Sequence, residues 1–121
     1  MPSILVVDDD TDTRRNMADL FGDLGYMVDA ADAGDTALEK AVQQPYDVGL
    51  LDLRMPRMDG LTLCRHLKRV RPRMVTMIVT AYGADSLGAE ARQAGARHIL
   101  GKPVEIPRLL ALVEQAVASA N

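Results

Sequence analysis

Short apolar segments alternate with longer amphipathic segments along this chain. The apolar segments are rich in Val, Ile and Leu, a composition that is typical of strands buried on both faces of a parallel sheet. We expect strands at residues 4–7, 26–31, 48–51, 75–79 and 99–100.

In the segments between and after these strands, apolar residues recur every three or four positions, which predicts amphipathic helices. In the first of them Met17, Leu20, Phe21 and Leu24 share one face, and Gly25 is expected to end the helix. The expected helices cover residues 12–24, 34–44, 59–70, 85–95 and 105–119.

The order of these elements predicts an α/β fold in three layers. Strands that alternate with helices form a parallel sheet with helices on both faces, and right-handed crossovers make it doubly wound. Such sheets bind ligands beyond the carboxyl ends of their strands. Because no linker, repeat or low-complexity stretch interrupts the pattern, we expect residues 1–121 to form a single domain.

Composition and charge exclude several classes of protein. The net charge of −3 argues against a nucleic-acid-binding surface. A single cysteine, Cys64, allows no disulfide within the chain and fits a reducing compartment. No apolar run approaches the roughly 20 residues of a membrane span, and Met1 to Ser3 lead straight into a strand. We therefore expect a cytoplasmic protein.

Polar residues follow most of the expected strands, and they should meet at one edge of the sheet. The second strand also ends in an acid, Asp32, but we expect that strand at the outer edge. The residues after the other strands are Asp8, Asp9 and Asp10, then Asp52, then Thr80, and finally Lys102 and Pro103.

Three carboxylates so close together need a compensating charge. Asp8, Asp9 and Asp52 cannot all stay ionised unless cations share the site. Lys102 supplies one positive charge, and a divalent cation could supply the rest. All the candidate ligands are hard oxygen atoms, which favours Mg²⁺, with Mn²⁺ as a substitute. A carboxylate beside such an ion can attack a phosphoryl group, and the Thr80 hydroxyl and Lys102 ammonium could hold its oxygens.

Taken singly, these residues have simpler interpretations. The run of acids from Asp8 to Asp10 could be a helix N-cap near the helix dipole, and Lys102 could be a solvated surface charge. The combination of acids, Thr80 and Lys102 at separate strand ends makes those interpretations weak. Asp10 is expected to be a cap or solvent residue and is left out of the metal site.

The motifs resemble those of receiver domains of bacterial two-component response regulators. The resemblance covers essentially the whole chain, in the order and close to the spacing of that family. It implies a flavodoxin-like (βα)5 fold with strand order 2-1-3-4-5. The motifs are Ile4-Leu5-Val6-Val7-Asp8-Asp9, Leu51 to Gly60 with Asp52 near its start, Thr80-Ala81, and Lys102-Pro103.

The resemblance also implies a role for each site residue. Asp52 would be the phosphoacceptor, Asp9 a direct Mg²⁺ ligand, and Asp8 a ligand through a metal-bound water. The backbone carbonyl of Arg54 would complete the protein ligands. Thr80 and Lys102 would hold the phosphoryl oxygens, and the Lys102–Pro103 bond is commonly cis in the family.

Function and partners follow from the same resemblance. The phosphoryl donor would be a sensor histidine kinase or a histidine phosphotransfer protein, and the signal would pass to an output domain or target protein. No direct contact with nucleic acid or membrane is expected. The protein would be a switch that catalyses only its own phosphorylation and dephosphorylation, not an enzyme for other substrates. The sequence leaves open whether it stands alone or is part of a longer regulator.

Several positions depart from the family pattern. Ile99 stands where a switching Tyr or Phe is usual, so we expect a muted or different conformational readout. Arg97 and His98 replace acids that help one subfamily to dimerise, and Val104 replaces a common phenylalanine. Arg54 and Tyr82 flank the expected path of the hydrolytic water, and their bulk predicts slow loss of the phosphoryl group.

Three other functions compete with a phosphoryl-accepting switch. A small Mg²⁺-dependent phosphohydrolase would also use an aspartate nucleophile, but it typically has a second acid where this chain has Arg54. A nucleotide-binding flavodoxin-like module would need a glycine-rich loop after the first strand, where Asp8 and Asp9 stand instead. A degenerate receiver that is never phosphorylated conflicts with the complete set of site residues.

Overall fold

A computed structural model describes residues 1–81 and 83–119. Strands and helices alternate from end to end in this part of the chain. The strands are β1 (Ser3–Val7), β2 (Met27–Ala31), β3 (Val48–Asp52), β4 (Val75–Thr80) and β5 (Ala96–Gly101). The helices are α1 (Thr11–Asp23), α2 (Gly34–Gln43), α3 (Gly60–Val70), α4 (Gly88–Ala94) and α5 (Ile106–Ser119).

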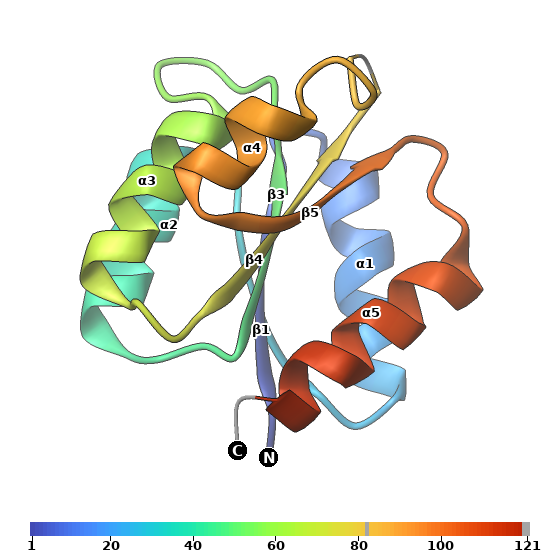
Figure 1. Cartoon of the computed structure of the whole chain (residues 1–121). Coiled ribbons are helices and arrows are strands. Elements are labelled where there is room, and N and C mark those ends of the chain that lie inside the picture. The colour runs from blue at the N-terminus through green and yellow to red at the C-terminus, as the bar shows by residue number, and fades with distance from the viewer. Residues whose placement is uncertain (82, 120–121) are drawn as a thin grey trace.

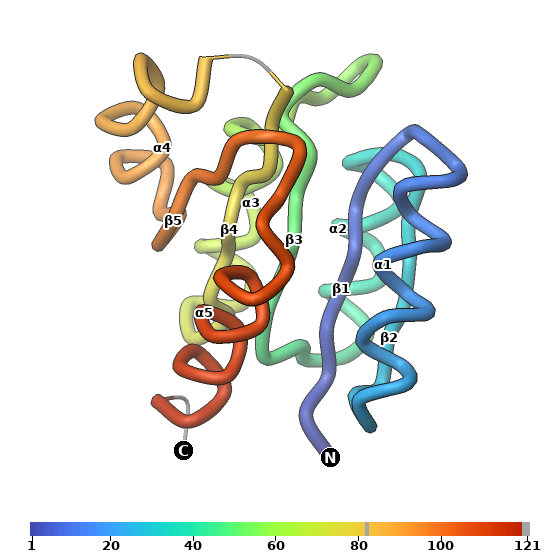
Figure 2. Tube along the Cα trace, turned by 90° about the vertical axis from the view of Figure 1, so that its right-hand side faces the viewer, coloured from blue at the N-terminus to red at the C-terminus, as the bar shows by residue number. Residues whose placement is uncertain are grey.

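The strands form one parallel sheet in the order β2-β1-β3-β4-β5. Helices α2, α3 and α4 cover one face, and α1 and α5 cover the other, as Figures 1 and 2 show from two directions. The expected three-layer, doubly wound (βα)5 fold with strand order 2-1-3-4-5 is thus confirmed. None of the helices in the described part is long and apolar enough to span a bilayer.

Each face of the sheet has its own aliphatic core. Under α2, α3 and α4 the core includes Leu5, Leu51 and Ile78, and under α1 and α5 it includes Ile4 and Leu50. Alternate residues of β1, β3 and β4 point to opposite faces, so these central strands are apolar almost throughout. Such burial removes apolar surface from water and fixes the register of the strands.

Local signals set the helix ends. The Asp10 carboxylate accepts a hydrogen bond from the Thr13 N–H and caps α1, and the Asp59 carboxylate caps α3 by accepting from the Thr62 N–H. The cap role expected for Asp10 is confirmed. Gly95 ends α4 with φ of 103°, a left-handed conformation that favours glycine.

Three details differ from the sequence prediction. Helix α4 begins at Gly88 instead of residue 85, because residues 83–87 form a turn in which Leu87 N–H donates to the Gly83 carbonyl. Strand β5 begins at Ala96 instead of residue 99. The prediction missed its first residues because β5 lies at the sheet edge, where the polar residues Arg97 and His98 are tolerated in a strand. Strand β2 lies at the sheet edge, as expected, but it is only partly buried and is not covered on both faces.

Candidate functional site

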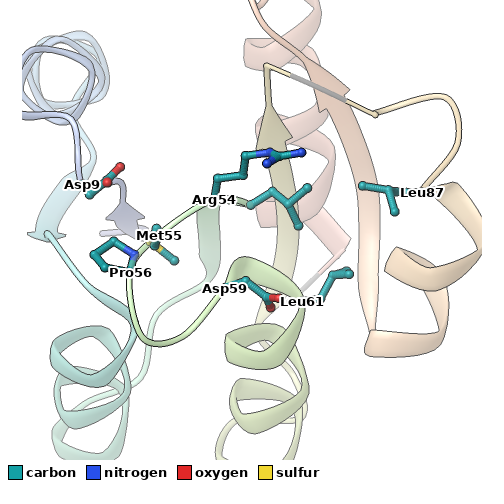
Figure 3. A pocket seen from close by; sticks show the side chains of 8 residues that line it. Asp9, Arg54, Met55, Pro56, Asp59, Leu61 and Leu87 are labelled. Atoms are coloured by element: carbon teal, nitrogen blue, oxygen red, sulfur yellow. The ribbon is translucent and has the colours of Figure 1, made fainter.

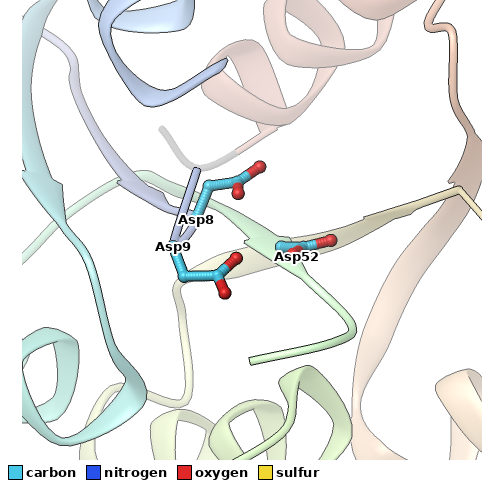
Figure 4. A group of neighbouring side chains, drawn as sticks. All are labelled: Asp8, Asp9 and Asp52. Atoms are coloured by element: carbon cyan, nitrogen blue, oxygen red, sulfur yellow. The ribbon is translucent and has the colours of Figure 1, made fainter. Parts of the chain in front are cut away.

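The carboxyl ends of β1 and β3 bring three acids together (Figure 4). One carboxylate oxygen from each of Asp8, Asp9 and Asp52 lies within 4.8 Å of the others. Asp8 is buried, Asp52 is half-buried and Asp9 is exposed. The parallel pairing of β1 with β3 is what places Asp52 beside two residues 43 and 44 positions earlier in the chain.

Asp8 is held by contacts on every side. Its N–H donates to the Ala31 carbonyl at 3.1 Å, and its Oδ1 accepts from the Asp10 N–H at 2.9 Å. Its Oδ2 accepts from the Lys102 ammonium at 3.0 Å. Both carboxylate oxygens are therefore already engaged, whereas no described residue donates a hydrogen bond to the Asp9 carboxylate.

Lys102 also contacts Asp52, with 3.4 Å between Nζ and Oδ1. Burial raises the pKa of Asp52, and the negative charge of Asp8 raises it further, against the opposing effect of Lys102. Burial alone would lower the pKa of Lys102, but its hydrogen bond to Asp8 and the charges of both acids outweigh burial and raise it. One ammonium thus leaves the acids only partly neutralised.

This arrangement fits a divalent cation. Three carboxylates and one ammonium leave an excess of negative charge, and a half-buried acid with a raised pKa gains from a nearby cation. The ligand atoms are all oxygens, with no His or Cys among them, which is the ligand chemistry of Mg²⁺. Asp9 and Asp52 are the residues best placed to hold such an ion directly.

A pocket of about 530 Å³ opens beside the acids (Figure 3). Asp9 lies at one side of it and Leu87 at another, and the loop between β3 and α3 forms much of the wall. Arg54, the residue whose carbonyl we expect near the metal, lines the same pocket as Asp9. The rest of the lining is apolar apart from a third charged residue, Asp59, and a small anionic group could enter from solvent.

The loop from β3 to α3 is fixed at both ends. The Gly60 N–H donates to the Leu53 carbonyl at 2.8 Å, and a Cβ on Gly60 would lie 2.4 Å from the Asp52 carbonyl oxygen. Arg57 adopts φ of 70° and its guanidinium reaches Asp35 at 3.4 Å. The start of α3 is therefore packed directly against the end of β3 that carries Asp52.

Thr80 is the last residue of β4, and its side chain is buried. Its carbonyl accepts from the Lys102 N–H at 2.8 Å, so the backbone ties the two strand ends together. The Lys102–Pro103 peptide bond is cis, as expected. Ile99 is partly buried and packs against the core under α4, while Tyr82 lies outside the described residues.

Sequence reasoning missed Arg14. From the first turn of α1 its Nη1 donates to the Asp8 carbonyl at 2.8 Å, which helps to fix the backbone between Asp8 and Asp9. Its spacing of six residues from Asp8 is the only sequence signal, and that spacing predicts nothing until the turn between β1 and α1 is known.

Comparisons with known proteins identify the family to which this chain belongs. The model of the response regulator receiver domain family matches residues 4–114. The chain belongs to the response regulator receiver domain family. A response regulator receiver protein of Anaeromyxobacter sp. (strain Fw109-5) is 39% identical over 112 residues, and the transcriptional regulatory protein ZraR of Escherichia coli (strain K12) is 37% identical over 118. These matches cover 93% and 98% of this chain, but only 47% and 27% of the relatives.

The fold of this receiver domain is shared with solved structures. A CheY-like receiver domain protein from Methanospirillum hungatei JF-1 superposes with a TM-score of 0.94 at 28% identity, over 99% of this chain and 96% of that one. The chain is thus a phosphorelay receiver and acts as a signalling switch. Its acidic pocket is of the kind that binds Mg²⁺ in receiver domains.

Proposed function

We propose that this receiver accepts a phosphoryl group on Asp52 from a histidine kinase or a histidine phosphotransfer protein, in a Mg²⁺-dependent reaction. The observation that supports Asp52 is its position: it shares a half-buried pocket with Asp8, Asp9 and the ammonium of Lys102. Asp9, Asp52 and the Arg54 carbonyl would hold the metal directly, and Asp8 would act through a bound water.

The residues of the chain divide the chemistry between them. An Asp52 carboxylate oxygen attacks phosphorus, and the bond from phosphorus to the nitrogen of the donor histidine breaks. Lys102 is positioned by Asp8 and would neutralise one phosphoryl oxygen, while the Thr80 hydroxyl would donate to another. The bound Mg²⁺ would supply further compensation of negative charge. Water later hydrolyses the acyl phosphate, and the bulk of Arg54 and Tyr82 would slow that step.

Other expectations belong to the same proposal. Residues 1–121 would be one receiver domain in the cytoplasm, with no substrate other than its own phosphodonor. The signal would pass to an output domain or target protein, with the readout muted at Ile99. A phosphohydrolase for small molecules is not favoured, because Arg54 stands where a second acid would be needed.

The test is phosphorylation in the absence of any kinase. The protein is incubated with Mg²⁺ and acetyl phosphate, and its intact mass is measured. We expect one added phosphoryl group in the wild type and none in Asp52→Ala or after chelation of the metal. A phosphoryl group that still appears on Asp52→Ala would place the acceptor elsewhere.

A further inference from the structure

Basic residues are concentrated in one segment of this chain. Five of its 14 Lys and Arg residues lie between residues 60 and 84, and that segment has no Asp or Glu. Elsewhere the remaining basic residues are outnumbered by 17 acids. The small net charge of −3 therefore conceals a positive segment in an otherwise acidic molecule.

The five residues belong to α3 and the turn after it, on the outside of the molecule (Figure 1). Arg65, Lys68, Arg69 and Arg73 are exposed, and we call them the basic stripe. The three in the helix are spaced by three and four positions, so they are neighbours on its surface. The opposite side of α3 packs in the core, which leaves the stripe facing solvent.

Ion pairs within the fold do not account for the basic stripe. Within the described residues, no acid lies within ion-pair distance of its four members, and like charges at these spacings repel one another. The helix dipole favours Lys68 and Arg69 in the last turn, but it does not account for Arg65 or Arg73.

Arg71, the fifth basic residue, shows the contrast. Its Nε donates to the Ala41 carbonyl at 2.7 Å and its Nη2 to the Val42 carbonyl at 3.3 Å, so it joins α3 to the end of α2. Two exposed apolar residues lie in the helix ends that this contact joins: Val42 in α2 is 59% exposed, and Val70, next to Arg69 in α3, is 37% exposed.

We propose that the basic stripe is a docking surface for a short acidic segment of a partner protein. Three of its four members are arginines, whose planar guanidinium groups bind carboxylates through two hydrogen bonds at once. Val42 and Val70 provide a place for an aliphatic side chain of the same segment.

The size of the patch favours a short segment over an extended polyanion. Screening limits charge interactions to about 8 Å at physiological salt, so a short peptide would respond chiefly to the stripe. Duplex DNA or an anionic membrane would also meet the acidic remainder of the surface. In addition, the apolar side of α3 is buried in the core and is not available for insertion into lipid.

Fluorescence anisotropy with a labelled peptide of repeated Glu-Glu-Leu triplets tests the proposal on the full chain. We expect salt-dependent binding that Arg65→Glu/Lys68→Glu/Arg69→Glu weakens by about tenfold or more. The matched control, Arg92→Glu/Arg97→Glu/Arg108→Glu, changes the net charge equally on another surface and should alter affinity by about twofold or less. Val42→Ser/Val70→Ser should weaken binding by a smaller factor of about threefold.

Several results would overturn the proposal. They are no binding by the wild type, an equal loss in both triple variants, or tighter binding of duplex DNA or phosphatidylglycerol vesicles through the stripe. Circular dichroism checks that each variant is folded, and Arg65→Gln/Lys68→Gln/Arg69→Gln replaces the charge reversal if it is not. Because the stripe is separate from the acidic pocket, acetyl phosphate should still phosphorylate all these variants, which separates this proposal from that for Asp52.

Discussion

Asp8 and Asp9 are neighbours in the chain, but their carboxylates have different surroundings. Asp8 is buried and both its oxygens are engaged, one by the Asp10 N–H and the other by Lys102. Asp9 is exposed and receives no hydrogen bond from any described residue. The difference supports the proposal that Asp9 contacts the metal directly, while Asp8 positions Lys102.

The first prediction compares Asp9→Asn with Asp10→Asn. Asp9→Asn should weaken Mg²⁺ binding by about tenfold or more, because an amide is a neutral and weaker ligand than a carboxylate. Asp10→Asn removes the same charge one residue away, where the side chain caps α1, and should leave Mg²⁺ affinity nearly unchanged. Isothermal titration calorimetry measures both, and equal losses would contradict the assignment.

The second prediction concerns Cys64, which is buried beside Thr76. Burial raises the pKa of its thiol, so the native protein should resist iodoacetamide at about pH 8 and react once urea unfolds it. In the unfolded chain the thiol ionises near its ordinary pKa of about 8.5. The buried, neutral thiol therefore contributes its full stabilisation below about pH 8.5. That stabilisation is lost as the pH rises through the higher pKa of the thiol in the folded protein.

This loss of stability can be measured as the urea concentration at the midpoint of unfolding, determined at a series of increasing pH values. The wild type should lose stability above about pH 8.5 more steeply than Cys64→Ala, which has no thiol to ionise. Rapid alkylation of the folded protein would show that the thiol is accessible after all.

At the scale of elements, two glycines in helices have opposite roles. Gly60 begins α3 against the Asp52 carbonyl, where a Cβ would lie at 2.4 Å, while a Cβ on Gly22 in α1 would meet no atom within 4 Å. The close approach at Gly60 holds the β3 end and the α3 start together. Gly22 makes no such close approach, and the backbone entropy that a glycine loses on folding destabilises the helix.

The third prediction follows from this contrast. Gly22→Ala should raise the free energy of unfolding by about 0.5–1 kcal/mol, since alanine is the better helix former. Gly60→Ala should lower it by about 1–3 kcal/mol, because the backbone beside Asp52 must shift. Urea unfolding measures both, and Gly60→Ala should also slow phosphorylation by acetyl phosphate whereas Gly22→Ala should not.

At the scale of the whole molecule, the ionised carboxylate of Asp52 opposes folding stability. Burial and Asp8 raise the pKa of Asp52, so its ionised form is less favourable in the folded protein than in the unfolded chain. The penalty is absent at low pH and grows as Asp52 ionises with rising pH. Under the proposed function, this loss of stability is the cost of placing a reactive carboxylate in the pocket.

The fourth prediction is that Asp52→Asn unfolds at higher urea than the wild type when Mg²⁺ is absent. The gain should be on the order of 1 kcal/mol at neutral pH, because one repulsive charge is removed. With Mg²⁺ added, the wild type should become the more stable of the two proteins. The wild type binds the ion more tightly, and this binding stabilises the folded state in proportion to the logarithm of the Mg²⁺ concentration. If Asp52→Asn were no more stable than the wild type without metal, charge repulsion at Asp52 would not be destabilising the fold.

Much of this architecture is encoded locally. The alternation of apolar and amphipathic segments predicted every strand and helix, and the residues at the strand ends predicted the pocket, because parallel strands must present their carboxyl ends at one edge. Local patterns misplaced the starts of two elements: β5, whose polar residues Arg97 and His98 resemble a loop, and α4, whose start depends on the turn at Gly83.

The sequence by itself determined the kind of chemistry, since only the residue types decide that the pocket offers oxygen ligands and one ammonium. Tertiary structure decided which acid is free and which is engaged. That choice depends on contacts such as those of Asp8 with Lys102 and Arg14, and on the burial of Asp52. Hydrogen bonds and desolvation arise only when distant segments meet, so no pattern along the chain can specify them.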